Sequence, residues 1–379
     1  MVSSKLPNTG TTIFSVMSKM SAEHNAINLS QGFPDFNCSE DLVRLVSDYM
    51  RKGYNQYAPM EGILPLREII AQKTEEIHSY KYNPETEITI TAGATQALFT
   101  AITACIKEGD EVIVFEPAYD SYVPAIRVNG GQPVFVGLKK PDFSIDWNEV
   151  KKSITARTRM IILNSPHNPS GSILSESDLN MLSKIVSGSK IIILSDEVYE
   201  HIIFDDNTHQ SLARFPKLAE QSIIVSSFGK TYHTTGWKMG YCMAPQRLMK
   251  EFRKIHQFLV YAVNTPIQFA LAEFLKRKNE YLELGKFYEQ KRDTFIELLN
   301  GSRFKIIPSK GTYFQLVDYS EITDEKDTEF ATRLTKEYGV AAIPISVFYH
   351  DSLKSKILRF CFAKSDKTLE QAAERLLKI

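Results

Sequence analysis

The chain has 379 residues, and its 45 Lys and Arg residues are balanced by 45 Asp and Glu residues, so the formal net charge is zero. Binding to nucleic acids or membrane surfaces depends on an excess of basic side chains. The balance therefore argues against both, while leaving room for one small basic pocket. A single domain stops growing near about 250–300 residues, which favours two domains or one large domain with an appendage.

Cysteine spacing and hydropathy further restrict the class of protein to which the chain can belong. The four cysteines, Cys38, Cys105, Cys242 and Cys361, form no CxxC pair, so we expect neither a metal site nor a disulfide framework. The N-terminus lacks the apolar core of a signal peptide, and no apolar run approaches the roughly 18 residues that would span a bilayer. We therefore expect a cytoplasmic protein.

Short apolar runs recur through the middle of the chain, and most are continuous and not alternating. This pattern is typical of strands buried on both faces in a mostly parallel sheet. The predicted strands are 87–91, 111–115, 160–164, 190–195, 222–226 and 238–244. Helical patterns at 96–106 and 175–187 separate some of them, the second with Ser175 as its N-cap. Alternating strands and helices predict an α/β domain.

After residue 250 the pattern changes to long helices with dense Lys and Glu. The predicted helices are 249–258, 266–278, 282–299 and, at the end, 369–377. Predicted strands at 304–307, 312–317 and 356–362 lie among them. This mixture suits a smaller α+β domain, and the helix near 280–299 is expected to bridge the two domains.

The most informative segment for chemistry is SSFGKTYHTTGWKMG at 226–240, which places Lys230 among small and hydroxylated residues where a strand ends. Desolvation at such a place lowers the pKa of an amine and makes it a nucleophile towards aldehydes. The segment SDEVYE at 195–200 puts Asp196 at the end of another buried strand. Strand ends of this kind are where α/β sheets bind ligands.

Two more strand ends carry complementary groups. The turn NSPHNPSG at 164–171 offers amides, and TAGATQAL at 91–98 runs through Gly93 into a helix whose first N–H groups can hold a phosphate. Pyridoxal 5'-phosphate (PLP) requires a lysine for its aldehyde, a partner for its ring nitrogen and an anion site for its phosphate. The four strand ends together therefore favour PLP as the cofactor.

In chain order, the motifs resemble the class I aminotransferases of PLP fold type I, from about Thr11 to the C-terminus. The likeness is greatest to the methionine and kynurenine–glutamine aminotransferase group. Besides the four segments above, it rests on NLSQGFPDF (28–36), NQYA (55–58), EPAYDSY (116–122) and LRFCFAK (358–364). The resemblance implies a large PLP-binding domain at 31–280, with a mostly parallel seven-stranded sheet between helices. A smaller α+β domain would comprise 1–30 and 281–379.

The resemblance also implies a set of cofactor residues. Lys230 would form the Schiff base and carry the substrate proton, and Asp196 would pair with the ring nitrogen. Tyr199 and Asn168 would hydrogen-bond the ring oxygen. The remaining cofactor residues would be Tyr119 stacked on the ring, Ala94, Thr95, Ser227 and Lys238 at the phosphate, and Tyr57 from the other subunit of a homodimer.

For the substrate, the resemblance implies that Arg359 clamps the α-carboxylate, because a guanidinium fork suits that group. The other substrate residues would be Asn168, Gly32, Phe14 and Tyr261. The segment 258–264 around Tyr261 does not match the kynurenine enzymes cleanly. Many relatives have Arg where Lys238 stands, and a lysine supplies the charge without the bidentate fork.

Structural explanations compete with several of these roles. Arg359 lies in an apolar strand pattern, where a buried salt bridge would also account for it. Packing alone would explain Tyr57 and Tyr119. For Phe14, a place in the core and a place in the pocket are equally favoured. His167 is better interpreted as a local hydrogen-bonding residue than as an acid or base.

The activity implied is transfer of an amino group from an L-amino acid to a 2-oxo acid by a ping-pong cycle, with pyridoxamine 5'-phosphate as the intermediate form of the cofactor. No second Arg can be assigned to a side-chain carboxylate, so methionine is favoured as donor, followed by aromatic amino acids, kynurenine or glutamine. A cysteine-conjugate β-lyase using the same lysine is the alternative. A silent PLP-binding regulator is disfavoured, because the residues before Thr11 are too few for a helix-turn-helix.

Overall fold

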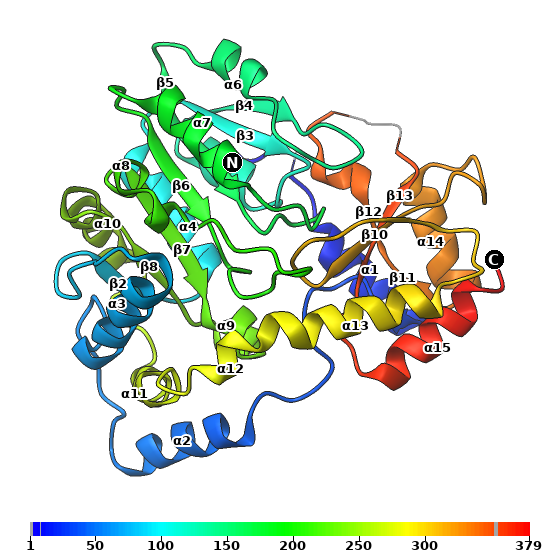
Figure 1. Ribbon diagram of the computed structural model, residues 1–379, viewed down its shortest axis with the longest axis horizontal. Coiled ribbons are helices and arrows are strands. Elements are labelled where there is room, and N and C mark those ends of the chain that lie inside the picture. The colour runs from blue at the N-terminus through cyan, green and yellow to red at the C-terminus, as the bar shows by residue number, and fades with distance from the viewer. Residues whose placement is uncertain (1–2, 8, 352–354) are drawn as a thin grey trace.

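A seven-stranded sheet forms the centre of the larger part of the molecule (Figure 1), in the order β2-β8-β7-β6-β5-β3-β4. The computed structural model describes residues 3–7, 9–351 and 355–379. The strands are β2 (Ile88–Thr91), β3 (Glu111–Glu116), β4 (Gln132–Gly137), β5 (Thr158–Asn164), β6 (Ile192–Asp196), β7 (Ser222–Ser227) and β8 (Gly240–Met243). Only β8 runs antiparallel to its neighbours, β2 and β7. The predicted α/β class with a mostly parallel sheet is confirmed.

The strands read as continuous apolar runs because both faces of the sheet are covered. In β6, Ile193 packs into one buried cluster and its neighbour Leu194 into the cluster on the opposite face. The same division separates Ile224 from Val225 in β7. Successive side chains of a strand point to opposite faces, so two buried faces require an apolar residue at nearly every position.

The helices before residue 283 include those that cover the two faces of the sheet, whereas the first of them packs against the C-terminal part. They are α1 (Ile13–Glu23), α2 (Glu40–Arg51), α3 (Leu64–His78), α4 (Ala94–Cys105), α5 (Tyr122–Val128), α6 (Trp147–Ser153), α7 (Glu176–Val186), α8 (Pro216–Ala219), α9 (Phe228–Thr231), α10 (Gln246–Leu259), α11 (Thr265–Phe274) and α12 (Asn279–Leu282). The predicted N-cap of α7 is confirmed. The Ser175 hydroxyl accepts from Asp178 N at 3.2 Å, and the Asp178 carboxylate accepts from Ser175 N at 2.9 Å.

The C-terminal part is built on a four-stranded sheet in the order β12-β13-β10-β9. Its elements are α13 (Leu284–Leu298), β9 (Lys305–Ile307), β10 (Phe314–Asp318), α14 (Asp327–Glu337), β11 (Val340–Ala341), β12 (Ile343–Pro344), β13 (Ile357–Cys361) and α15 (Asp366–Leu376). The helix α13 runs from the large sheet to this part (Figure 1). Strand β1 (Ile27–Asn28) pairs with β11, which brings the N-terminal segment to the C-terminal part. The exact division at residues 30 and 280 remains a prediction.

The topology brings the chemically important strand ends together. Strands β5, β6 and β7 are parallel neighbours, so Asn164, Asp196 and Ser227 lie at one edge of the sheet. Gly240 of β8 is paired with both Thr91 and Ser227, and this places the start of α4 at the same edge. Within the described ranges, no helix is long and apolar enough to cross a membrane.

Candidate active site

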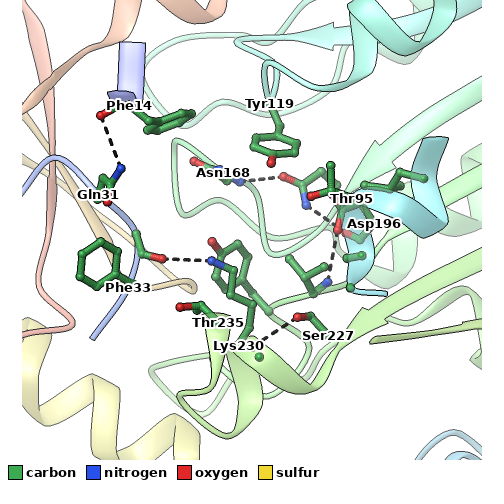
Figure 2. Close-up of a pocket in the computed structure, with 18 of the residues that line it drawn as sticks. Phe14, Gln31, Phe33, Thr95, Tyr119, Asn168, Asp196, Ser227, Lys230 and Thr235 are labelled. Carbon is green, nitrogen blue, oxygen red and sulfur yellow. Dashed lines mark hydrogen bonds between the residues drawn. The ribbon is translucent and has the colours of Figure 1, made fainter. Parts of the chain in front are cut away.

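A cavity of about 310 Å³ opens at this edge of the large sheet. Its walls come from the strand ends, from Phe314 and Arg359 of the C-terminal sheet, and from the N-terminal segment. In Figure 2, Lys230, Asp196, Asn168 and Tyr119 lie around the same space. The cavity gathers twelve of the sequence-predicted residues: Phe14, Gly32, Ala94, Thr95, Tyr119, Asn168, Asp196, Tyr199, Ser227, Lys230, Lys238 and Arg359.

Lys230 lies on the short helix α9 directly after β7. The Ser227 hydroxyl caps this helix by accepting from Lys230 N at 3.3 Å. No carboxylate pairs with the amine in the described chain; its Nζ donates to Tyr313 Oη at 2.7 Å and to the Gly32 carbonyl at 3.0 Å. Burial lowers the pKa of the amine to about 8, and the nearby positive charges of Arg359 and Lys238 act in the same direction. A neutral, nucleophilic amine is therefore accessible near neutral pH.

Asp196 supplies a buried carboxylate on the other side of the cavity. Its Oδ2 accepts from Tyr122 Oη at 2.6 Å and its Oδ1 accepts from Val198 N at 3.4 Å. Burial raises the pKa of Asp196 to about 6, although the bond from Tyr122 opposes the shift. Among the described residues no cation lies within ion-pair distance of this carboxylate, so it is suited to a cationic group of a ligand.

Arg359 is fully buried in β13, yet the residues described include no carboxylate within 4.0 Å of it. Its Nη1 donates to Asn168 Oδ1 at 2.6 Å and its Nη2 to the Ser30 carbonyl at 2.8 Å, while its Nε has no partner. Its guanidinium lies 3.8 Å from the centroid of the Phe314 ring. A structural salt bridge therefore does not explain this charge. A buried guanidinium with an unused donor points to an anionic ligand.

Asn168 is oriented by this same bond. A guanidinium only donates, so the atom facing Arg359 must be the amide oxygen, and the Nδ2 group is left to donate elsewhere. Asn168 N donates to Asn164 Oδ1 at 2.8 Å, and Asn164 Nδ2 donates to the Asp196 carbonyl at 2.9 Å. Arg359 thus holds the side chain of Asn168 and Asn164 holds its backbone, and the Nδ2 group, which has no partner in the described chain, can donate to a ligand oxygen.

The part of the cavity next to the N-terminus of α4, the phosphate end, is suited to a phosphate. The helix α4 begins at Ala94 after Gly93, which has a φ of +81° and provides no capping side chain. Its first N–H groups are therefore open to an anion. Lys238 and the hydroxylated Ser227 and Thr95 line the same end. A Cβ on Gly240 would lie 3.0 Å from Ala94 N, so the close approach of β8 to this helix requires a glycine.

The family model for class I and II aminotransferases matches residues 24–376. The chain belongs to this family. It is 51% identical over 377 residues to the methionine aminotransferase of Escherichia coli (strain K12), with 99% of this chain and 98% of the relative covered. It is 32% identical over 395 residues to the human kynurenine–oxoglutarate transaminase 1, with 95% and 94% covered.

Solved structures agree with this assignment. The crystal structure of YbdL from E. coli, reported with a methionine aminotransferase function, has a TM-score of 0.98 and 50% identity over all of both chains. An N-succinyldiaminopimelate aminotransferase from Mycobacterium tuberculosis has a TM-score of 0.96 and 36% identity, again over the whole of both chains. The predicted aminotransferase activity and family are confirmed.

Aminotransferases of this family depend on PLP, and the cavity fits it on its own evidence. An uncapped helix with a lysine matches a phosphate, an unpaired buried carboxylate matches a protonated ring nitrogen, and an amine with a lowered pKa matches an aldehyde. Bound PLP supplies the aldehyde that accepts the amino group and the ring that withdraws electrons from the substrate Cα. Lys230 would remove and return the substrate proton, while Arg359 orients the α-carboxylate.

Two predicted residues, Tyr57 and Tyr261, do not line the cavity of this chain. Their side chains are 81% and 56% exposed, and their rings lie 5.2 Å apart at 84°. Tyr57 was expected to act across a subunit boundary, which a single chain does not test. Tyr261, expected in the substrate pocket, lies outside the pocket that this chain forms by itself, because it packs against Tyr57 at the surface.

His167 has the local role expected of it. The Pro117 carbonyl only accepts, so the nitrogen 3.0 Å from it, Nε2, carries the proton, and Nδ1 accepts from the Ser170 hydroxyl at 2.7 Å. Burial lowers the pKa of this imidazole to about 4. The ring is therefore neutral and fully bonded, and it has no part in proton transfer.

Two functional tyrosines were missed by the sequence reasoning. Tyr122 is the first residue of α5 and hydrogen-bonds Asp196, and Tyr313 contacts the amine of Lys230. The only available signal for Tyr122 was its spacing in EPAYDSY, three residues after Tyr119. Tyr313 lay inside a predicted strand, and nothing in the pattern indicated the direction of its hydroxyl.

PLP binding is expected to be lost as the pH falls and Asp196 becomes protonated. Replacing Tyr122 by phenylalanine should raise the pH at which this loss occurs. Asp196 holds a ring cation only when ionised, and the Tyr122 hydroxyl stabilises that ionised form against burial. Its loss should raise the pKa of Asp196 by about one unit. Titrating PLP into cofactor-free protein across pH 5 to 8 would reveal the shift on the acid side. A Tyr82→Phe variant is the control, since that buried hydroxyl has no partner in the described chain; coincident profiles for Tyr122→Phe and wild type would contradict the role.

Proposed function

We propose that this aminotransferase uses methionine as its preferred amino donor, with aromatic amino acids or kynurenine second. The observation that carries the proposal is the set of residues around Arg359, at the end of the cavity where the substrate would bind. Arg359 is the only arginine that lines the described cavity, and its guanidinium lies 3.8 Å from the ring centroid of Phe314 and 5.3 Å from that of Phe14. Phe33 lines the same cavity. One cation suits the α-carboxylate, and aromatic walls suit an apolar or thioether side chain.

The similarity to named relatives supports methionine as the first donor. The relative at 51% identity is named a methionine aminotransferase, and the kynurenine transaminases share 32–34%. A dicarboxylic donor would need a second cation, and Lys238 lies at the phosphate end beside Gly93. We do not propose the β-lyase alternative, because each of these relatives is named an aminotransferase or transaminase and no feature of the cavity favours elimination.

Steady-state rates across a panel of donors would test the proposal. Methionine, phenylalanine, kynurenine, glutamine and aspartate would each be paired with several 2-oxo acids, and the released 2-oxo acid measured. We expect the highest kcat/KM for methionine and at least about a hundredfold lower value for aspartate, whose second carboxylate would be buried without a partner. Equal or higher kcat/KM for aspartate would overturn the proposal.

We further propose a cytoplasmic homodimer in which Tyr57 completes the phosphate site of the partner subunit. Its support is the exposure of large aromatic side chains: Tyr57 and Tyr261 pack against each other at the surface, and Phe258 is 88% exposed. Such an apolar surface is costly to leave in water. Sedimentation should give a dimer, and Tyr57→Phe should weaken PLP binding while the dimer persists. A fully active monomer would remove Tyr57 from the site.

A further inference from the structure

The amine of Lys230 lies between two oxygen atoms that no role described so far requires. Its Nζ is 2.7 Å from Tyr313 Oη and 3.0 Å from the Gly32 carbonyl, and Tyr313 Oη donates to the same carbonyl at 2.7 Å. The three groups come from α9, from the loop after β1 and from the residue before β10. Each oxygen therefore accepts from the amine while the hydroxyl and the carbonyl also bond each other.

Both oxygens are held in place by their surroundings. Tyr313 is fully buried, and its ring packs against the rings of Tyr199 at 5.1 Å and Phe314 at 5.0 Å. A Cβ on Gly32 would lie 2.6 Å from the Phe314 ring, so the backbone reaches this position only because residue 32 has no side chain. The hydroxyl and the carbonyl are therefore fixed before the amine arrives.

We propose that Tyr313 and the Gly32 carbonyl hold the amine of Lys230 whenever that amine is free, which makes Tyr313 a positioning residue for the proton-carrying lysine. A substrate amino group bound at the cofactor aldehyde would leave Lys230 unattached for part of each transamination cycle. A free lysine has a flexible four-carbon stem that samples many rotamers. Two fixed acceptors restrict it to the side of the cavity where the proton is transferred. This role is independent of which amino acid is the donor.

The groups around the amine determine in which direction its pKa should change when Tyr313 is replaced. Arg359 and Lys238 disfavour its protonated form, whereas the carboxylate of Asp196 favours it. The phenols of Tyr199 and Tyr313 stay neutral, because burial raises the pKa of each. An acceptor that bonds the ammonium stabilises the proton on it, so removal of the Tyr313 hydroxyl should lower the pKa of Lys230.

The experiment compares Tyr313→Phe with Tyr288→Phe. Tyr288 is equally buried and packs 5.5 Å from Tyr313, but its hydroxyl has no partner among the residues described. Full-length enzyme would be loaded with pyridoxamine 5'-phosphate, which leaves the lysine free. Lys230 would then be methylated with formaldehyde and cyanoborohydride at a series of pH values, and the peptide that contains it quantified by mass spectrometry.

For Tyr313→Phe we expect the midpoint of labelling to fall by about one pH unit, since one hydrogen bond to a charged group is lost. We also expect kcat to fall several-fold with little change in KM for the donor. Tyr288→Phe should behave as wild type in both measurements. A wild-type midpoint in Tyr313→Phe, or an equal shift in both variants, would overturn the proposal. Neither result would alter the ranking of donors, so failure here is distinguishable from failure of the proposed substrate.

Discussion

Replacing Lys230 by alanine will lower kcat for amino transfer by about 10²–10⁴-fold, the range that removal of a proton-transferring group produces. The reason is geometric as well as electrostatic. Lys230 is the cavity lysine whose amine contacts Tyr313 and Gly32, and its lowered pKa leaves it able to take a proton from the substrate. The measurement is the rate of 2-oxo acid release from methionine in enzyme saturated with PLP.

The control for this prediction is Lys254→Ala. Lys254 lies on α10 and pairs with Glu251 at the surface, 2.8 Å apart, so its loss should change neither kcat nor stability measurably. Thermal unfolding of both variants would show whether the fold is kept. Wild-type kcat in a folded Lys230→Ala enzyme would contradict the assignment of the proton-carrying lysine.

Replacing Arg359 by methionine will cost about 2–5 kcal/mol of transition-state binding, or roughly 30-fold to several thousandfold in kcat/KM for an amino acid. The guanidinium that receives the α-carboxylate is lost, and Asn168 Oδ1 and the Ser30 carbonyl lose their donor. An Arg359→Lys variant keeps the charge without the fork and should show a smaller loss, about 10- to 100-fold.

A substrate analogue separates binding of the carboxylate from general damage to the site. The amine that lacks the α-carboxylate of methionine cannot use Arg359, so its low kcat/KM should be nearly the same in wild type and Arg359→Lys. The preference for the amino acid over this amine should therefore shrink in the variant. If both substrates lost the same factor, Arg359 would be a structural residue and not the carboxylate clamp.

The central strands could be predicted because burial on both faces leaves a strong signal in the sequence. The centres of β6 and β7, 192–194 and 223–225, are apolar at every position. The edge strand β4 (Gln132–Gly137) was missed: it contains Pro133, and its exposed ends do not distinguish it from a loop. The two-residue strands β1 and β11 exist only through their pairing with each other, which no local pattern reveals.

Site residues could be predicted where their place in the site follows from their position at the end of a strand. Parallel neighbours end at one edge, so Asp196 and Ser227 were expected to meet, and they do. The role of a tyrosine depends on where its hydroxyl points, and this explains why Tyr122 and Tyr313 were missed. For Arg359 the sequence left a salt bridge and a ligand as alternatives. The choice required knowing that no carboxylate of the described chain lies within 4.0 Å.

The most direct test of the whole account is to find which lysine carries the cofactor. PLP-loaded enzyme would be reduced with borohydride, digested, and its peptides mapped by mass spectrometry. We expect one pyridoxyl-modified peptide, with the modification on Lys230, because that buried amine lines the cavity and has a lowered pKa. Modification of Lys238 or of a lysine outside the cavity, with Lys230 unmodified, would contradict this expectation.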